Sequence, residues 1–299
     1  MYVVLGASGN TGRVVANTLL GRGHKVRVVG RNAVHLQPFT SKGAEAFPSD
    51  ITNSEGLTRA FAGAHAAYVL IPPDPTSNDY PAFQNRVSDA IATAVKTSGL
   101  KHVVSLSSVG ADKPSGTGPV AGLHRMEEKL NRVEGANVLH LRAGYFMENT
   151  LSQVNAIRAL GSAAGPLRPD LKLPMIAARD IGTVAADVLL RLDFKGKQAQ
   201  ELHGQLDLDY SEVARIIGKA IGKVDLGYIQ ATDDQFREAL LQMGMTRNFS
   251  DLILEMAHAL NSEYMKALEP RFARNTTPTS YETFVAEQFV PLYQQQAAA

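Results

Sequence analysis

The feature that most constrains the fold is a glycine-rich turn within the first twelve residues. Residues 2–5 are apolar and mostly β-branched, and apolar residues at helical spacing begin at Val14. Between them stand three glycines, Gly6, Gly9 and Gly12. They permit a tight turn and let a pyrophosphate approach the backbone. A second strand at 25–30 closes a βαβ unit of about 30 residues, the context in which such a turn indicates dinucleotide binding.

We expect the free N–H groups and the positive end of the following helix dipole to face the phosphates. The residues predicted to hold them form one loop: Gly6, Ser8, Gly9, Asn10, Thr11 and Gly12.

Alternation of short apolar strands with helical stretches predicts an α/β protein, a Rossmann-type doubly wound parallel sheet. We expect residues 1–150 to form this NAD(P)-binding domain and residues 151–299 to form a mainly helical part packed against it, with possible chain crossovers. Strands are predicted near 2–6, 25–30, 44–48, 66–71, 101–106 and 137–142, and helices near 11–21, 33–40, 53–62, 80–98 and 120–133. Ligands should bind beyond the carboxyl ends of the strands.

Composition narrows the function. The 299 residues are 44% hydrophobic and 20% charged, as in an ordinary globular protein. The formal net charge of +1 does not indicate binding to nucleic acid or to an anionic membrane. Because the sequence has no cysteine, thiolate chemistry and cysteine-ligated metals are excluded. Redox chemistry would therefore need an organic cofactor. No metal site is expected. No signal peptide or membrane span is apparent, which predicts a cytoplasmic protein. The sequence carries no signal for the oligomeric state, so a monomer and a homodimer both stay open.

The ends of the second and third strands suggest which nucleotide binds. An NAD site would carry an acidic residue about 20 positions after the glycines, but Arg31 stands there. A guanidinium matches a 2′-phosphate, so we expect NADP(H). The alternative is a solvated arginine. Asp50, after the third strand, is either an acceptor for the adenine amino group or a helix-cap acid.

Two later strand ends complete the predicted cofactor site. The fourth strand ends at Ile71 and Pro72, where a proline-rich loop would lie along the cofactor or be a plain loop. Ser107, after the fifth strand, would hydrogen-bond cofactor or substrate, or simply end the strand.

Four motifs carry a family resemblance: the glycine turn, Ser107-Ser108, residues 142–149 and residues 178–182. Together they resemble the NmrA-like family of atypical short-chain dehydrogenases/reductases, and most of all its NADPH-dependent quinone oxidoreductase and azoreductase-like branch. The resemblance implies a Rossmann domain with a smaller C-terminal substrate-binding part. The family also contains transcriptional co-regulators that bind a dinucleotide and perform no chemistry.

The sequence departs from the wider superfamily at its catalytic pair. Ordinary members carry a tyrosine four residues before a lysine on the helix after the fifth strand, whereas Val120 and His124 stand at the matching positions. An unactivated carbonyl needs that acid, but a quinone can be reduced largely by being positioned over the nicotinamide. His124 is a candidate proton donor or ribose ligand; otherwise it is a surface histidine beside Glu127 and Glu128 on a solvated helix face.

Residues after the sixth strand are predicted to meet the nicotinamide. Gly144 supplies flexible backbone, and Tyr145, a candidate catalytic residue, and Phe146 would stack on a planar ring or join the core. Met256 and Met265 are expected in the core or lining a pocket, and Asp180 at a helix N-cap.

Two hypotheses follow. The first is an NADPH-dependent oxidoreductase that transfers hydride directly to a quinone or a similar planar acceptor. The second is a catalytically silent NADP(H)-binding redox sensor or transcriptional co-regulator, which would need a protein partner.

Overall fold

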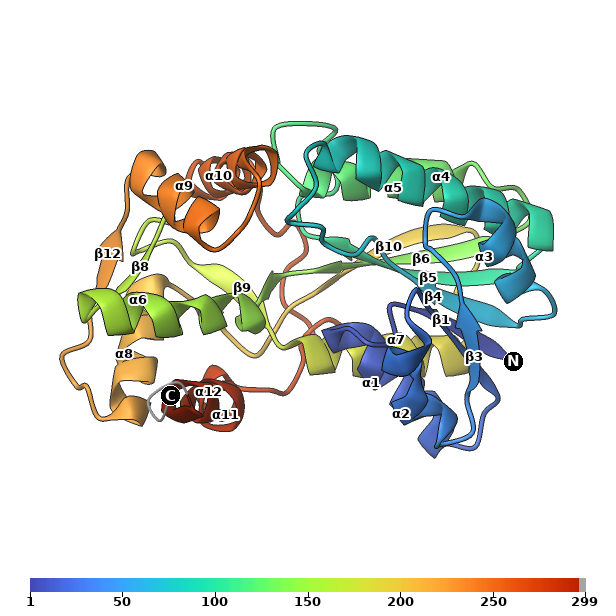
Figure 1. The fold of residues 1–299 in the computed structure, drawn as a ribbon, viewed down its shortest axis with the longest axis horizontal. Coiled ribbons are helices and arrows are strands. Elements are labelled where there is room, and N and C mark those ends of the chain that lie inside the picture. The colour runs from blue at the N-terminus through green and yellow to red at the C-terminus, as the bar shows by residue number, and fades with distance from the viewer. Residues whose placement is uncertain (296–299) are drawn as a thin grey trace.

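The computed structural model describes residues 1–295, which form two closely packed halves. In one half a twisted sheet is covered by helices on both faces, and the other half is mainly helical with two small sheets (Figure 1). This arrangement confirms the predicted α/β Rossmann-type fold with a smaller helical C-terminal part.

The large sheet has seven strands, all parallel, in the order β10-β6-β5-β4-β1-β2-β3. Six of them lie where the sequence predicts strands: β1 (Tyr2–Leu5), β2 (Val26–Gly30), β3 (Glu45–Pro48), β4 (Ala66–Val69), β5 (His102–Ser108) and β6 (Asn137–Ala143). Between β3 and β4 the chain returns to the other side of β1, so β1 and β4 flank the switch point at which ligands bind in such sheets.

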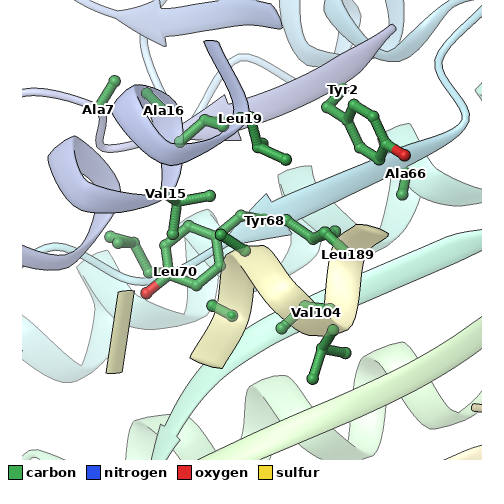
Figure 2. Packing of buried hydrophobic residues seen from close by; sticks show 14 of the residues in the cluster. Tyr2, Ala7, Val15, Ala16, Leu19, Ala66, Tyr68, Leu70, Val104 and Leu189 are labelled. Carbon is green, nitrogen blue, oxygen red and sulfur yellow. The ribbon is translucent and has the colours of Figure 1, made fainter. Parts of the chain in front are cut away.

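Helices cover the two faces of this sheet. On one face, α3 (Ser54–Phe61), α4 (Tyr80–Ser98) and α5 (Val120–Asn131) lie side by side (Figure 1). On the other, α1 (Asn10–Gly21) packs against α7 (Ala178–Arg191), with η1 (Ala33–Leu36) and α2 (Gln37–Thr40) nearby. Figure 2 shows Val15 and Leu19 of α1, Tyr68 of β4 and Leu189 of α7 in one buried cluster. Burial of this apolar surface fixes the glycine turn against the sheet.

The chain crosses between the halves after residue 150. Helix α7 and strand β10 (Lys197–Leu202) both return to the large sheet, and β10 pairs with β6 as a seventh strand that the sequence analysis did not predict. Four of the six residues of β10 are polar or charged and its first three are exposed, so it lacks the apolar run of an inner strand.

The rest of the C-terminal part surrounds a separate apolar cluster. Its helical elements are η2 (Met147–Ser152), α6 (Gln153–Leu160), α8 (Tyr210–Ile221), α9 (Asp233–Gln242), α10 (Arg247–Asn261), α11 (Tyr281–Phe284), η3 (Val285–Phe289) and α12 (Val290–Gln295). Its short strands are β7 (Tyr145–Phe146), β8 (Ala163–Gly165), β9 (Leu173–Ile176), β11 (Asp207–Leu208) and β12 (Tyr228–Gln230). Over residues 1–295, no helix is long and apolar enough to cross a bilayer, and no group of three metal-binding side chains occurs.

Candidate functional site

The predicted cofactor residues lie along one edge of the large sheet. Because the strands are parallel, their carboxyl ends line up, and this edge carries Asp50 beyond β3, Arg31 beyond β2, Gly6 beyond β1, Ile71 beyond β4, Ser107 near the end of β5 and Gly144 beyond β6. The five strand spacings from β3 to β6 span roughly 24 Å. His124 is not at a strand end but on helix α5.

The glycine turn is tightly packed, and neither Gly6 nor Gly12 has room for a Cβ without close contacts. Gly6 has φ +63°, and a Cβ there would lie 3.0 Å from the side chain of Leu70, the residue that follows β4. A Cβ on Gly12 would lie 2.3 Å from the Gly6 carbonyl oxygen, a distance that no real Cβ adopts. Ser8, Gly9 and Asn10 are exposed at the top of the turn. The turn therefore fits the close approach of a phosphate, and any side chain at Gly12 would distort it.

The first turn of α1 leaves its N–H groups available to a ligand. Gly9 is the N-cap residue and supplies no side-chain cap, and the first turn has no acidic residue. The positive end of the helix dipole is thus uncompensated, which favours an anion. Thr11 points the other way, because its hydroxyl oxygen accepts a hydrogen bond of 2.9 Å from the buried Tyr68 hydroxyl. That bond ties α1 to β4 across the switch point.

Arg31 and Asp50 lie near each other at the β2–β3 end of the edge, and both are exposed. Asp50 accepts hydrogen bonds from the Thr52 backbone N–H (2.8 Å) and hydroxyl (2.6 Å). These bonds, with a smaller contribution from the Arg31 charge, hold the pKa of Asp50 below its usual value. The N-cap of α3 is Asn53, which accepts from Gly56 N–H, so Asp50 orders the turn before the helix without capping it.

The loop after β4 is tied to the C-terminal half. Ile71 is buried and Pro72 half-buried, and three hydrogen bonds then join residues 75–80 to the start of α10. Thr246 N–H donates to the Pro75 carbonyl (2.9 Å) and the Thr246 hydroxyl to the Ser77 carbonyl (2.6 Å), while Tyr80 N–H donates to Asn248. The wall beside the switch point is therefore held by both halves.

A cavity of about 450 Å³ opens where β5 and β6 end. From the sheet it is lined by Ser108 and Val109 and by Gly144, Tyr145 and Phe146. Most of the remaining wall comes from the C-terminal half: Asn149, Arg168, Asp170, Leu171, Lys172, Leu173, Pro174, Asp207, Met256, Leu260, Glu263, Met265, Lys266 and Ala267. Met256 and Met265 thus both pack on the C-terminal core and line the pocket. Ser107 and His124 do not contribute to this wall.

Tyr145 joins the cavity to a buried group of phenols. Its hydroxyl lies 3.0 Å from that of Tyr210, and the two rings meet edge to face. Tyr210 in turn packs on Tyr228, with ring centroids 4.7 Å apart. Burial raises the pKa of Tyr145 and raises that of Tyr210 well above its usual value, so both hydroxyls are protonated at neutral pH.

Ser107 is engaged by an ion pair that the sequence did not reveal. Its hydroxyl donates to Glu127 (2.5 Å), and Arg142 of β6 binds both oxygens of the same carboxylate at 3.0 and 2.6 Å. Glu127 is only 4% exposed, so the interpretation of Glu127 and Glu128 as one solvated helix face is wrong for Glu127. The error arises because the partner of Glu127 lies on the next strand.

The half-buried His124 is anchored through one ring nitrogen. Its Nδ1 lies 2.8 Å from the Ala111 carbonyl, which can only accept, so Nδ1 carries the proton and Nε2 is the acceptor in the neutral ring. Helix α5 contains no tyrosine, and its single lysine, Lys129, pairs with Asp89 of α4 at 2.6 Å.

Sequence reasoning missed Tyr210, Arg142 and the wall residues Arg168 and 170–174. Tyr210 is 65 positions from Tyr145, and no local pattern links them. Arg142 stands in a motif singled out for family resemblance, but its charge gave no sign of a buried partner. The one signal available in the sequence was that Arg142 is a charged residue in a predicted buried strand, because a buried charge needs a partner.

Comparison with known proteins identifies the family of this chain. The model of the NmrA-like family matches residues 2–286. NAD(P)H azoreductase from Xenophilus azovorans is 27% identical over 267 residues, which cover 89% of each chain.

Two solved structures share the fold. The NADPH-dependent quinone oxidoreductase of Escherichia coli in complex with NADPH superimposes with a TM-score of 0.75 at 20% identity, covering 98% of this chain and 100% of that one. The negative transcriptional regulator NmrA in complex with NADP gives a TM-score of 0.73 at 15% identity, covering 99% and 97%. Because the family model spans nearly the whole sequence, this chain belongs to the NmrA-like family.

Proposed function

We propose that this protein is an NADPH-dependent oxidoreductase that transfers hydride directly to a quinone or a similar planar, electron-poor acceptor. One observation carries the proposal: the cavity lies at the β5–β6 end of the same strand-end edge that carries the glycine turn at its centre and Arg31 toward the other end. A dinucleotide laid along that edge with its 2′-phosphate at Arg31 would present its nicotinamide to the cavity. The azoreductase and quinone oxidoreductase relatives act as NAD(P)H-dependent reductases by name, which supports this assignment.

In this proposal each part of the edge binds one part of NADPH. The turn Gly6–Gly12 and the first N–H groups of α1 hold the pyrophosphate, and Arg31 holds the 2′-phosphate. Asp50 would accept a hydrogen bond from the adenine amino group through Oδ2, since Thr52 binds only Oδ1, and Ile71 and Pro72 would flank the nucleotide. The bound cofactor supplies the hydride; the chain binds, orients and excludes water.

The shape and lining of the cavity favour a flat acceptor. Tyr145 and Phe146 present aromatic rings at its sheet end, and Leu171, Leu173 and Met256 give apolar walls that can sandwich a ring. A volume of about 450 Å³ suits a small aromatic molecule. A quinone spreads the charge of the incoming hydride over its ring, so orientation contributes much of the rate.

The direct test is NADPH oxidation with a panel of benzo- and naphthoquinones under anaerobic conditions, with NADH in parallel. We expect turnover with at least one quinone and a preference for NADPH. Absence of turnover across the panel by a protein that binds NADPH would refute the enzymatic function.

That outcome would favour a second function, an NADP(H)-binding sensor. The observation behind it is that α5 offers no tyrosine and the NmrA regulator shares the fold. A sensor should show a partner interaction that changes with the oxidation state of the bound nucleotide.

A further inference from the structure

The position of the Tyr145 hydroxyl indicates a role for this group in addition to the stacking of the ring on a ligand. Tyr145 follows directly on Gly144 at the end of β6 and lines the cavity. Its hydroxyl also lies 3.0 Å from that of Tyr210, which is 4% exposed and does not line the cavity. The phenol thus stands between a ligand-sized space and a buried hydrogen-bonding group.

Few acceptors are available to the hydroxyl proton of Tyr210. Over residues 1–295 its hydroxyl hydrogen-bonds only to Tyr145, because the neighbouring Tyr228 hydroxyl donates to the Leu167 carbonyl at 3.0 Å. A phenol has one proton to donate and lone pairs that accept. When Tyr210 donates to the oxygen of Tyr145, the proton of Tyr145 is left for a molecule in the cavity.

The chemistry proposed for the cavity requires such a proton. When hydride adds to a quinone, the product carries negative charge on oxygen and becomes a hydroquinone only after protonation. Helix α5 supplies neither a tyrosine nor a free lysine at this place. His124 does not line the cavity. Tyr145 is the lining residue whose hydroxyl is held by a second buried donor.

We infer that Tyr145 is the general acid that protonates the reduced acceptor and that Tyr210 is its positioning residue; this inference rests on the proposed reductase function. The acceptor gains two electrons and a hydrogen as hydride while NADPH becomes NADP⁺. The O–H bond of Tyr145 breaks as an O–H bond forms on the acceptor. The resulting tyrosinate is stabilised by the Tyr210 hydroxyl and takes a proton from solvent water after the reduced product has left the cavity.

Three tyrosine-to-phenylalanine variants test this assignment, because each removes one hydroxyl and keeps its ring. Tyr145→Phe should lower kcat for quinone reduction about 100-fold or more, the range of general acid catalysis, and change KM little. Tyr210→Phe should lower kcat about tenfold, as expected for the loss of one hydrogen bond to a charged oxygen. Tyr228→Phe is the matched control: it belongs to the same buried group but bonds a backbone carbonyl, and its kcat should equal that of the wild type.

The pH profile separates a proton donor from a packing residue. With Tyr145 protonated across the neutral range, kcat of the wild type should be nearly flat there. In Tyr145→Phe the proton must come from solvent, so the residual kcat should rise as pH falls. A merely structural role would lower kcat equally at every pH.

Two readouts do not depend on turnover. The NADPH dissociation constant of Tyr145→Phe should match that of the wild type. In cofactor-free protein labelled with [ζ-¹³C]tyrosine, the Tyr145 resonance, assigned by its loss in Tyr145→Phe, should move in Tyr210→Phe and stay in place in Tyr228→Phe.

The outcomes are distinguishable. If the wild type reduces no quinone, the proposed function fails and the inference falls with it. If the wild type is active but Tyr145→Phe retains wild-type kcat and pH dependence, the inference alone is overturned. A Tyr145 resonance that is unchanged in Tyr210→Phe would overturn the role of Tyr210.

Discussion

The two ends of the strand-end edge are built in different ways. At the β1 end, Gly6, Gly12 and the start of α1 lie within a dozen residues and present backbone N–H groups. At the β6 end, the cavity is assembled from side chains as far apart as Ser108 and Ala267. Local backbone geometry thus fixes how a nucleotide is held, and long-range packing fixes what meets it. The first can be read from sequence spacing, whereas the second needs the fold.

The largest effect is expected from the ion pair between the buried Glu127 of α5 and Arg142 of β6. Glu127→Gln leaves Arg142 buried without its counter-charge, so it should lower the free energy of unfolding by about 3–5 kcal/mol. The adjacent Glu128, half-exposed and paired with Arg132 at the C-cap of α5, is the matched control, and Glu128→Gln should cost less than about 1 kcal/mol. Denaturant unfolding measures both; equal effects would mean that Glu127 is solvated after all.

The next effect tests the backbone cradle. Gly12→Ala forces a Cβ against the Gly6 carbonyl, so we expect the NADPH dissociation constant to rise about 100-fold, roughly the loss of two good phosphate contacts. Gly21, near the C-terminal end of the same helix, has open space around its Cβ position. Binding by Gly21→Ala should therefore match the wild type. If Gly12→Ala bound NADPH as tightly as the wild type, the proposal that backbone geometry at the β1 end of the edge holds the nucleotide would be wrong.

A pH effect is expected from His140, which lies on β6 between Ser105 (2.6 Å) and Asn131 (3.0 Å). Burial lowers its pKa to about 4; among the nearby charges Glu127 raises it, and Arg142 and Lys197 lower it. The unfolded state therefore binds more protons between pH 6.5 and 4, and stability falls as pH falls through that range. The loss between pH 7 and pH 5 should be about 2 kcal/mol.

Comparison of unfolding curves at the two pH values isolates this contribution. His140→Gln should remove about that much of the pH dependence, whereas replacement of the exposed His35 by glutamine should leave it intact. Identical pH dependence in the wild type and His140→Gln would contradict the assignment of His140 as a buried neutral base.

The smallest effect concerns nucleotide choice at the far end of the edge. Arg31→Ala should weaken NADPH binding about tenfold, the value of one charge-assisted contact at an exposed site, and leave NADH binding nearly unchanged. Fluorescence titration with both nucleotides measures the ratio. Equal weakening of the two would show that Arg31 does not contact the 2′-phosphate.

These contrasts explain how far the sequence could predict the structure. The glycine turn and six strands follow from local patterns of spacing and hydrophobicity, and the structure has all of them. Asp180 shows why local patterns also fail: it matches an N-cap, yet α7 begins at Ala178, whose N–H is bound by Glu148 from 30 positions away. Asp180 is instead buried and accepts hydrogen bonds from the Thr279 N–H and hydroxyl.

The cavity could not be predicted from local sequence patterns for the same reason. The pairing of Tyr145 with Tyr210 depends on where α8 packs after the chain has crossed to β10 and back. The polar strand β10 is part of that path, and its sequence lacks the apolar run that marks an inner strand.

The central claim is that one nucleotide spans the edge from Arg31 to the cavity. The most direct test is a crystal structure of the protein with NADP⁺. We predict the pyrophosphate against the first turn of α1 and nicotinamide C4 facing the cavity, within about 4 Å of Tyr145 or Phe146. A nicotinamide lying outside the cavity, or a C4 atom covered by the protein's own side chains, would contradict the account.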